Sequence, residues 1–250
     1  MSEEPLEVSA EIAGPPEQIW ELIASGPGIS AWFMPATVEP RVGGAIEQRH
    51  APGEEGVARG EITAFEPPRR FVYEESWDDQ TIATEYLVEA RAGGSCVVRI
   101  VTHGLGCGDD AFADGLVSGW TQALATLAAR VEAFDGLPVG FERLWAPAAG
   151  TLEEAWPAFL AALGLAGARA GDTVALAADG LPPLRGTVAV VVDHGLVLRT
   201  DAPAAGVLRV AGTGFGGRTS VVVDRYRYGG EDPQAAAAAE RAAWERFLGA

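Results

Sequence analysis

Short alternating segments separated by turn residues fill the stretch between residues 37 and 104, and they constrain the fold more than any other feature. Apolar and polar side chains alternate in a strand-like way at residues 45–49, 57–65, 70–77, 81–90 and 96–103. The breaks between them are Gly43-Gly44, Pro52-Gly53, Pro67-Pro68, Asp78-Asp79 and Gly93-Gly94. Because such pairs favour tight reversals, consecutive segments are expected to form hairpins. The sequence therefore predicts an antiparallel sheet.

Helical patterns lie on both sides of this sheet. Residues 6–12 alternate like a strand, and a helix with an apolar stripe then runs from Pro15 until Ser25-Gly-Pro-Gly28 stops it. Residues 29–35 are expected to form a short apolar helix or a loop. A long amphipathic helix follows at residues 110–134, and its apolar face carries Leu116, Trp120, Leu124, Leu127 and Val131. This order predicts an α+β fold in which a curved sheet grips one long helix.

Several stretches of this first half also occur, in the same order, in one known family. They are residues 15–33 (PPEQIWELIASGPGISAWF), 42–47 (VGGAIE), 60–77 (GEITAFEPPRRFVYEESW), 93–106 (GGSCVVRIVTHGLG) and 119–127 (GWTQALATL). Residues 1–135 thus resemble the START/SRPBCC superfamily, and within it the homologues of the heat-shock-protein ATPase activator. The resemblance implies a helix-grip fold with a ligand cavity between the sheet and the long helix. It also implies that Phe33 and Met34 form an exposed apolar lid at the cavity entrance.

The second half repeats landmarks of the first in the same order. Trp156 follows Trp20 by 136 positions, residues 186–198 align without a gap on residues 60–72, and Trp244 follows Trp120 by 124 positions. Chance echoes in a chain rich in Ala, Gly and Val are the alternative explanation. A duplication is preferred, and it predicts tandem helix-grip units: a complete domain at residues 1–137 and a reduced, diverged copy at residues 138–250. A helix stop and connector at residues 136–140 mark the boundary.

Strands of the second unit are expected at residues 141–145, 173–177, 187–192, 196–200, 206–211 and 219–226, with a helix beginning near Leu152. The apolar segment at residues 29–35 has no counterpart there. The two halves also differ in net charge. Residues 1–136 hold 23 acidic residues and 8 Arg (−15), and the remaining residues hold 12 acidic residues and 10 Arg (−2).

Composition excludes several classes of function. With 48 % hydrophobic residues the chain can bury a core, and its net charge of −17 opposes binding to nucleic acid. All 18 basic residues are Arg, so lysine-based Schiff-base chemistry is excluded. The only cysteines, Cys96 and Cys107, are too few for a disulfide framework and fit a reducing cytoplasm. No targeting or membrane-spanning segment is expected.

No catalytic or metal-binding motif is evident. The Gly-rich strings at residues 104–108 and 212–217 lack the lysine and the strand-to-helix context of phosphate loops. His50, His103 and His194 are isolated in sequence, so neither a metal site nor a cofactor is expected. If Val98, Ile100 and Thr102 face the interior, alternation directs His103 outward.

Aromatic and polar side chains on the inward face define the candidate ligand-binding site. The candidate residues are Phe33, Met34, Phe71, Tyr73, Glu75, Trp77, Tyr86, Thr102, Trp120 and Leu124. A solid core explains the apolar members equally well. Hydroxyls and a carboxylate on an inward face require partners, however, and an apolar pocket with a few polar groups is typical of ligand sites.

Three functions remain open. The first is a cytoplasmic START-like protein that binds a small apolar or amphipathic ligand between the sheet and the 110–134 helix. The second is an enzyme of the cyclase or hydratase type, with Tyr73, Tyr86, Glu75 or His103 as acid–base groups. The third, which only the resemblance supports, is a chaperone-ATPase-activator-like module that binds a protein partner. A space filled by side chains would contradict the first.

Overall fold

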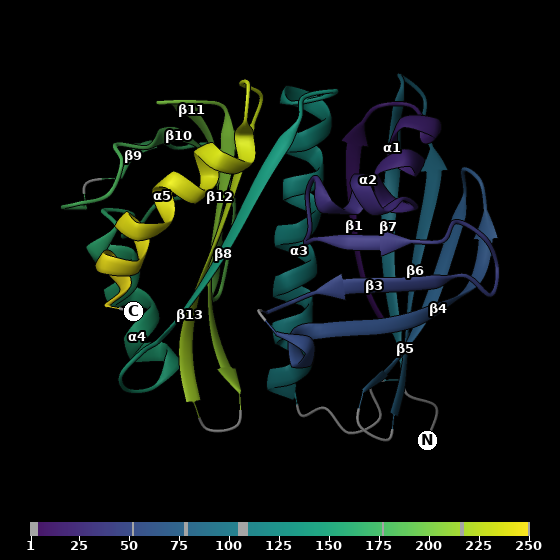
Figure 1. The fold of residues 1–250 in the computed structure, drawn as a ribbon, viewed down its shortest axis with the longest axis horizontal. Helices are drawn as coiled ribbons and strands as arrows, with labels where there is room; N and C mark the ends of the chain where they lie inside the picture. The colour runs from purple at the N-terminus through teal and green to yellow at the C-terminus, as the bar shows by residue number, and fades with distance from the viewer. Residues whose placement is uncertain are drawn as a thin grey trace. The chain divides into compact units, whose positions relative to one another are not determined.

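The computed structural model describes residues 5–51, 53–77, 80–104, 110–176, 178–215 and 218–249. Within these ranges the side chains of residues 55, 77, 80, 110, 111 and 215 also lie outside the description. The chain divides into two compact units, Met1–Ala133 and Phe134–Ala250, and each is described by itself (Figure 1). The division lies just before the connector from which the sequence placed a boundary at residues 136–140.

Unit 1 contains one antiparallel sheet and a long helix. Its elements are β1 (Leu6–Ala13), α1 (Pro16–Ile23), α2 (Gly26–Ser30), β2 (Ala36–Val38), β3 (Ala45–Arg49), η1 (Glu54–Gly56), β4 (Val57–Glu66), β5 (Arg70–Trp77), β6 (Gln80–Ala90), β7 (Ser95–His103) and α3 (Asp110–Ala133). The strand order is β1-β7-β6-β5-β4-β3-β2. The helix α3 lies along one face of the curved sheet (Figure 1), where its Leu124, Leu127 and Val131 are buried. This is the predicted helix-grip arrangement.

Unit 2 repeats this plan with fewer elements. They are β8 (Val139–Pro147), α4 (Leu152–Ala162), β9 (Thr173–Ala175), β10 (Arg185–Val192), β11 (Gly195–Ala202), β12 (Gly206–Phe215), β13 (Arg218–Tyr228) and α5 (Pro233–Leu248). The strand order, β8-β13-β12-β11-β10-β9, is that of unit 1 without a strand corresponding to β2. Among the described residues no element corresponds to α2 either. The predicted tandem fold, with a reduced second copy, is confirmed.

The helix stop expected at Ser25-Gly-Pro-Gly28 is confirmed, because α1 ends at Ile23. The sequence did not predict that a second helix starts within the same run. The Ser25 hydroxyl accepts a hydrogen bond from the Gly28 backbone N–H (3.0 Å), and Pro27 lies in the first turn of α2. Both features are favourable at a helix N-terminus. The chain therefore turns from α1 directly into α2, which places the following residues 31–35 near the sheet interior.

Candidate functional site: a buried polar cluster in unit 1

The predicted residues with described side chains converge on the space between the sheet and α3. Tyr86 is fully buried on β6, and Tyr73 on β5 and Leu124 on α3 are each 1 % exposed. The remaining buried members are Phe33, Met34, Phe71, Thr102 and Trp120. Strand alternation brings the residues of β5, β6 and β7 to one face, as the sequence predicted. Trp77 ends β5, and its side chain lies outside the described part of the structure.

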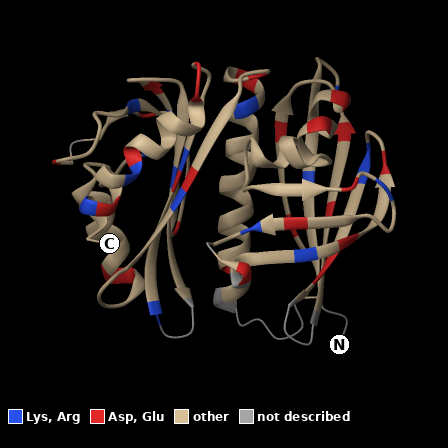
Figure 2. Cartoon of the chain, in the orientation of Figure 1, with Lys and Arg blue, Asp and Glu red and all other residues tan. Residues whose placement is uncertain are grey.

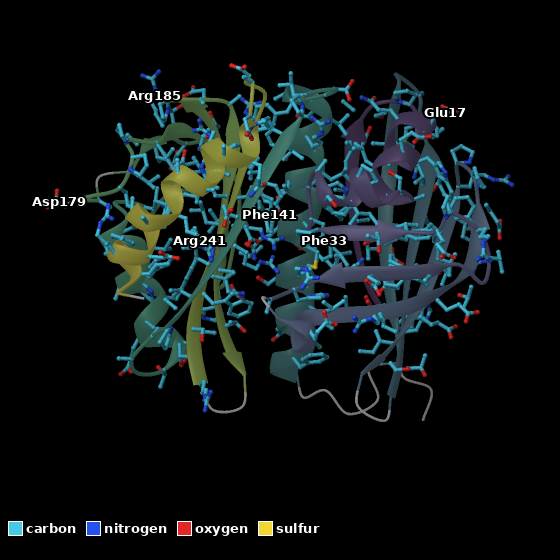
Figure 3. All side chains as sticks on the ribbon, in the orientation of Figure 1. Glu17, Phe33, Phe141, Asp179, Arg185 and Arg241 are labelled. Carbon is cyan, nitrogen blue, oxygen red and sulfur yellow. The ribbon has the colours of Figure 1, made fainter. Side chains whose placement is uncertain are left out.

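The expected exposure of Phe33 and Met34 is wrong. Phe33 is 8 % exposed and Met34 is 3 % exposed. The Phe33 ring stacks on Trp120 with centroids 5.1 Å apart, and Figure 3 labels Phe33 beside α3. The physical reason is the path of α2, which turns the chain inward so that both side chains join the core. They close the interior rather than form an open lid.

Stacked rings also fill the middle of the predicted cavity. Trp120 meets Tyr86 edge to face at 6.2 Å, and Tyr86 stacks on Phe71 at 6.0 Å and on Tyr73 at 6.3 Å. Such centroid distances are those of direct aromatic contact. The middle of the predicted cavity is therefore filled with side chains, which contradicts a ligand lying at this level, and the core interpretation applies to Phe71 and Trp120.

The polar atoms among these rings form a connected but incomplete network. The Gln48 side-chain N–H donates to the Tyr73 hydroxyl (3.2 Å), and the Trp120 indole N–H donates to the Thr102 hydroxyl (3.2 Å). Gln48, from β3, is 2 % exposed and was not predicted as a site residue. Its alternation with the buried Ile46 was the signal that could have identified it. We call Gln48, Tyr73, Glu75, Tyr86 and Thr102 the inner polar cluster.

One polar atom of the inner polar cluster has no partner. The Glu75 Oε1 atom is buried and makes no hydrogen bond. The Tyr86 hydroxyl lies outside the usual hydrogen-bond geometry, but a side-chain interaction with the Tyr73 hydroxyl contributes to the pKa of both tyrosines. A buried polar atom without a partner costs about 1–3 kcal/mol, so such atoms commonly mark a site for a missing group.

Burial controls the protonation of the inner polar cluster. It raises the pKa of the Glu75 carboxyl to about 7, because removal from water disfavours the charged form. Burial also raises the pKa of the Tyr73 and Tyr86 hydroxyls above their ordinary value, with the nearby Glu75 charge adding to the effect. Both tyrosines are therefore neutral hydrogen-bonding groups near neutral pH, whereas Glu75 can gain or lose a proton.

His103 lies away from this cluster, as the sequence predicted. Its side chain is 47 % exposed and lies 3.8 Å from the Glu85 carboxylate on the outer face of the sheet. Cys96 is a buried free thiol near the Gly14 carbonyl, while Cys107 lies outside the described residues. Neither His103 nor Cys96 can serve as an acid–base group for the inner polar cluster.

Unit 2 lacks the inner polar cluster at corresponding positions. In unit 1, Tyr73 pairs with Thr84 across β5 and β6, and Thr84 pairs with Thr102 on β7. In unit 2 the matching row is Leu198, Leu208 and Arg225. Leu198 and Leu208 are fully buried in an apolar core.

The adjacent row of cross-strand neighbours also has aliphatic residues in unit 2 where unit 1 has mainly aromatic ones. Phe71, Tyr86 and Ile100 of unit 1 correspond to Leu196, Val210 and Val223 of unit 2, all of them fully buried. The Glu75 position is taken by Thr200. Unit 2 therefore preserves the scaffold without the groups that make the unit 1 interior polar.

Buried charges in unit 2 have partners instead. Arg225 on β13 donates to Glu240 of α5 (2.9 Å) and to the Thr200 hydroxyl (3.3 Å). On the opposite face of the sheet, Arg143 and Arg209 both bind the fully buried Asp224. Holding the Asp224 carboxylate between two guanidinium groups lowers its pKa despite burial. These contacts join adjacent elements and are structural.

Open hollows lie elsewhere on the units. One of about 290 Å³ lies on the outer face of the unit 1 sheet and includes Arg69 and Arg99. Another of about 570 Å³ lies beside Trp145 on β8 and Arg218 on β13. Neither hollow includes a predicted site residue. Within the described ranges no group of His, Cys, Asp and Glu side chains is arranged to hold a metal ion. No helix in the described part of the chain is both long and apolar enough to cross a membrane.

Comparisons with known proteins concern mainly unit 1. Residues 13–132 match the model of the family described as activator of Hsp90 ATPase homolog 1-like protein. No curated protein matches the chain. Protein MLL2253 from Mesorhizobium loti is 21 % identical, with 53 % of this chain and 99 % of that chain covered and a TM-score of 0.47. The Aha1 dimer from Colwellia psychrerythraea is 17 % identical, with 52 % and 98 % covered and a TM-score of 0.43.

One similar structure spans both units. DynU16, from the dynemicin biosynthetic locus, is 16 % identical to this chain. The match covers 99 % of this chain and 97 % of DynU16, with a TM-score of 0.47.

Proposed function

Residues 13–132 belong to the activator of Hsp90 ATPase homolog 1-like family, and from that premise we propose that unit 1 binds a small amphipathic molecule at its inner polar cluster. The observation that carries the proposal is the buried Glu75 Oε1 atom, which has no hydrogen-bond partner. A ligand that donates to Glu75 removes this deficit and can also bond to the neighbouring Tyr86 hydroxyl. Its apolar part would contact the surrounding aromatic rings.

The position of the rings limits where the ligand lies. Phe33 and Tyr86 each contact Trp120, and the three rings fill the middle of the interior. We therefore place the polar group of the ligand at the Glu75 end of β5 rather than at the centre of the sheet. A larger ligand would enter by displacing Phe33, which lies between α2 and β2 and outside both elements.

In this proposal unit 2 does not bind the ligand. Apart from Thr200 and Arg225, its equivalent positions are aliphatic, and Arg225 binds the Glu240 carboxylate. Among the described residues its inner face has no unpartnered buried carboxylate and thus no equivalent site for the same ligand. The function of the chain is thus assigned to unit 1, and the cytoplasm remains the proposed compartment.

The experiment is native mass spectrometry of the purified full chain. We expect an additional mass bound to the wild-type protein, and we expect Tyr86→Phe to reduce its occupancy several-fold, because a hydroxyl available to the ligand is lost with little change in shape. Glu74→Gln is the matched control, since Glu74 is exposed on the same strand. A bound molecule retained equally by wild type and Tyr86→Phe would contradict the proposed site.

An enzyme of the cyclase or hydratase type is the second candidate. The specific observation is the Glu75 carboxyl, whose pKa of about 7 suits proton transfer near neutral pH. The same mass spectrometry distinguishes the two functions. Chemically different molecules bound to wild type and to Glu75→Gln would indicate turnover, whereas an identical molecule in both would indicate binding alone.

The family description also names an ATPase activator, which makes a protein partner the third candidate. The observation that agrees with it is the acidic excess of unit 1, visible as red segments on its strands and helices in Figure 2. Charge of this kind favours association with a basic surface. It identifies no particular docking residues, so the small-ligand function is preferred.

A further inference from the structure

Glu75 is half-buried, and its Oε1 atom is buried without a hydrogen bond and without a counter-ion among the described residues. Burial is the cause of its raised pKa, with no offset from a nearby cation. The arginines of the neighbouring strands are engaged elsewhere: Arg59 binds Glu47 and Glu54, and Arg70 binds Glu66 and Glu85. An ionised carboxylate in such surroundings is costly unless a positive charge joins it.

The groups around Glu75 are of a kind that accepts a cation. Tyr73 lies two residues from Glu75 on the same face of β5, and the Tyr86 ring stacks on Tyr73 with centroids 6.3 Å apart. Trp120 continues the aromatic wall, with its ring 6.2 Å from Tyr86. Aromatic faces attract organic cations by their quadrupole, and an adjacent carboxylate adds a direct ion pair. Gln48 and Thr102 supply neutral oxygen atoms and no competing positive charge.

Other ligand chemistries satisfy this environment less well. A neutral hydroxyl could donate one hydrogen bond to Glu75 but would leave its charge without compensation. A carboxylate or phosphate would be repelled by Glu75, and the described part of the cluster contains no arginine to attract it. A cation is the class that uses both the carboxylate and the rings.

We infer that the ligand of unit 1 carries a positively charged nitrogen, an ammonium or quaternary ammonium group, which the Glu75 carboxylate and the aromatic rings of the inner polar cluster hold together. This inference rests on the proposed function, because it specifies the ligand for the same site. It assigns the cation site to unit 1 alone, since Thr200 occupies the Glu75 position in unit 2.

The test compares three probes of similar shape on the full chain. Benzyltrimethylammonium carries the charge, neopentylbenzene is its neutral carbon isostere, and phenylacetate carries the opposite charge. Titrations are followed by NMR through the indole N–H of Trp120. We expect the cation to bind at least tenfold more tightly than the isostere, and phenylacetate to bind most weakly.

Variants test whether the Glu75 carboxylate causes the preference for the cation over the isostere. Glu75→Gln should abolish the difference between cation and isostere, while Glu75→Asp, which preserves the charge, should retain part of it. Glu74→Gln is the control and should behave as wild type. Thermal unfolding verifies that each variant is folded, and Glu75→Asp serves as the informative variant if Glu75→Gln is unstable.

Each outcome has a distinct meaning. Equal binding of the cation and the isostere, or a cation preference that survives in Glu75→Gln, would overturn the inference while leaving the interior as a ligand site. If no probe perturbs Trp120 and no molecule co-purifies with the chain, both the inference and the proposed function are wrong.

Discussion

Glu75 is the residue whose environment departs most from what its type prefers. It is a carboxylate among aromatic rings, and its Oε1 atom has no hydrogen bond. The fully buried Asp224 carboxylate of unit 2, in contrast, lies between two arginines. Glu75 also belongs to the inner polar cluster of unit 1, which is why we place function there.

The pH dependence of stability follows from this residue. Because folding raises the pKa of Glu75 from 4.5 to about 7, the folded state binds its proton more tightly than the unfolded state. The contribution of Glu75 to stability is fully present below pH 4.5 and is lost as the pH rises through 7. The loss amounts to at most about 3 kcal/mol.

Denaturant unfolding between pH 5 and pH 8 measures this effect. We expect Glu75→Gln to lack this component of the pH dependence and to be more stable than wild type at pH 8. Glu74→Gln is the control for the loss of one charge from β5. A wild-type stability that does not fall relative to Glu75→Gln across this range would show that Glu75 is solvated.

At the scale of elements, the Glu240 carboxylate of α5 binds two arginines of the unit 2 sheet. Glu240 on α5 binds Arg225 (2.9 Å) and Arg227 (2.8 Å), both on β13. The Arg225 side chain is 1 % exposed. A second ion pair on the same helix, Arg241 with Glu245, is about 40 % exposed at both partners and is therefore screened by water.

Replacing the glutamate of each ion pair by glutamine is therefore expected to reduce stability by unequal amounts. Glu240→Gln leaves two guanidinium groups without their carboxylate in a largely dry environment, and we expect a loss of about 3 kcal/mol of stability. Glu245→Gln should cost less than about 0.5 kcal/mol. Thermal and chemical unfolding of the two variants provide the comparison, and similar losses for both would mean that the Arg225 region is hydrated.

At the scale of the whole molecule, the chain consists of two units with the same topology and different interiors. The division at Ala133–Phe134 assigns Phe134 to unit 2, where its ring stacks on Tyr228 with centroids 4.5 Å apart. The sequence placed the boundary at residues 137 and 138, because glycines and a proline follow Phe134. We propose that each unit folds as a separate domain, with Phe134 belonging to the second.

Fragments test this proposal. Residues 134–250 are expected to fold as a domain and to be about 3 kcal/mol more stable than residues 138–250, because the shorter fragment loses the buried Phe134 ring. Circular dichroism and thermal unfolding measure both. Introducing Phe134→Ala into the longer fragment should reproduce the loss, and equal stability of all three fragments would show that the Tyr228 stack contributes nothing.

Prediction from sequence succeeded where the relevant signal is local. The faces of β5, β6 and β7 follow from alternation, and the burial of Tyr73, Tyr86 and Thr102 agrees with it. The duplication was visible because turns and core positions recur at a nearly constant spacing. The missed start of α2 at Ser25 shows the limit, since Gly-Pro-Gly is compatible with a stop and with a first turn.

The amino-acid sequence by itself determined which side chains face the interior, because strand and helix periodicity are properties of neighbouring residues. Only the tertiary structure decided how those side chains meet. Gln48 reaches Tyr73 from a strand 25 positions away, and Phe33 closes on Trp120 rather than facing solvent. The lack of a partner for Glu75 Oε1 likewise follows from the absence of a hydrogen-bond donor on the described elements around it. Periodicity indicates which face of an element is buried, but the partner of each side chain depends on contacts between distant segments, which local periodicity does not specify.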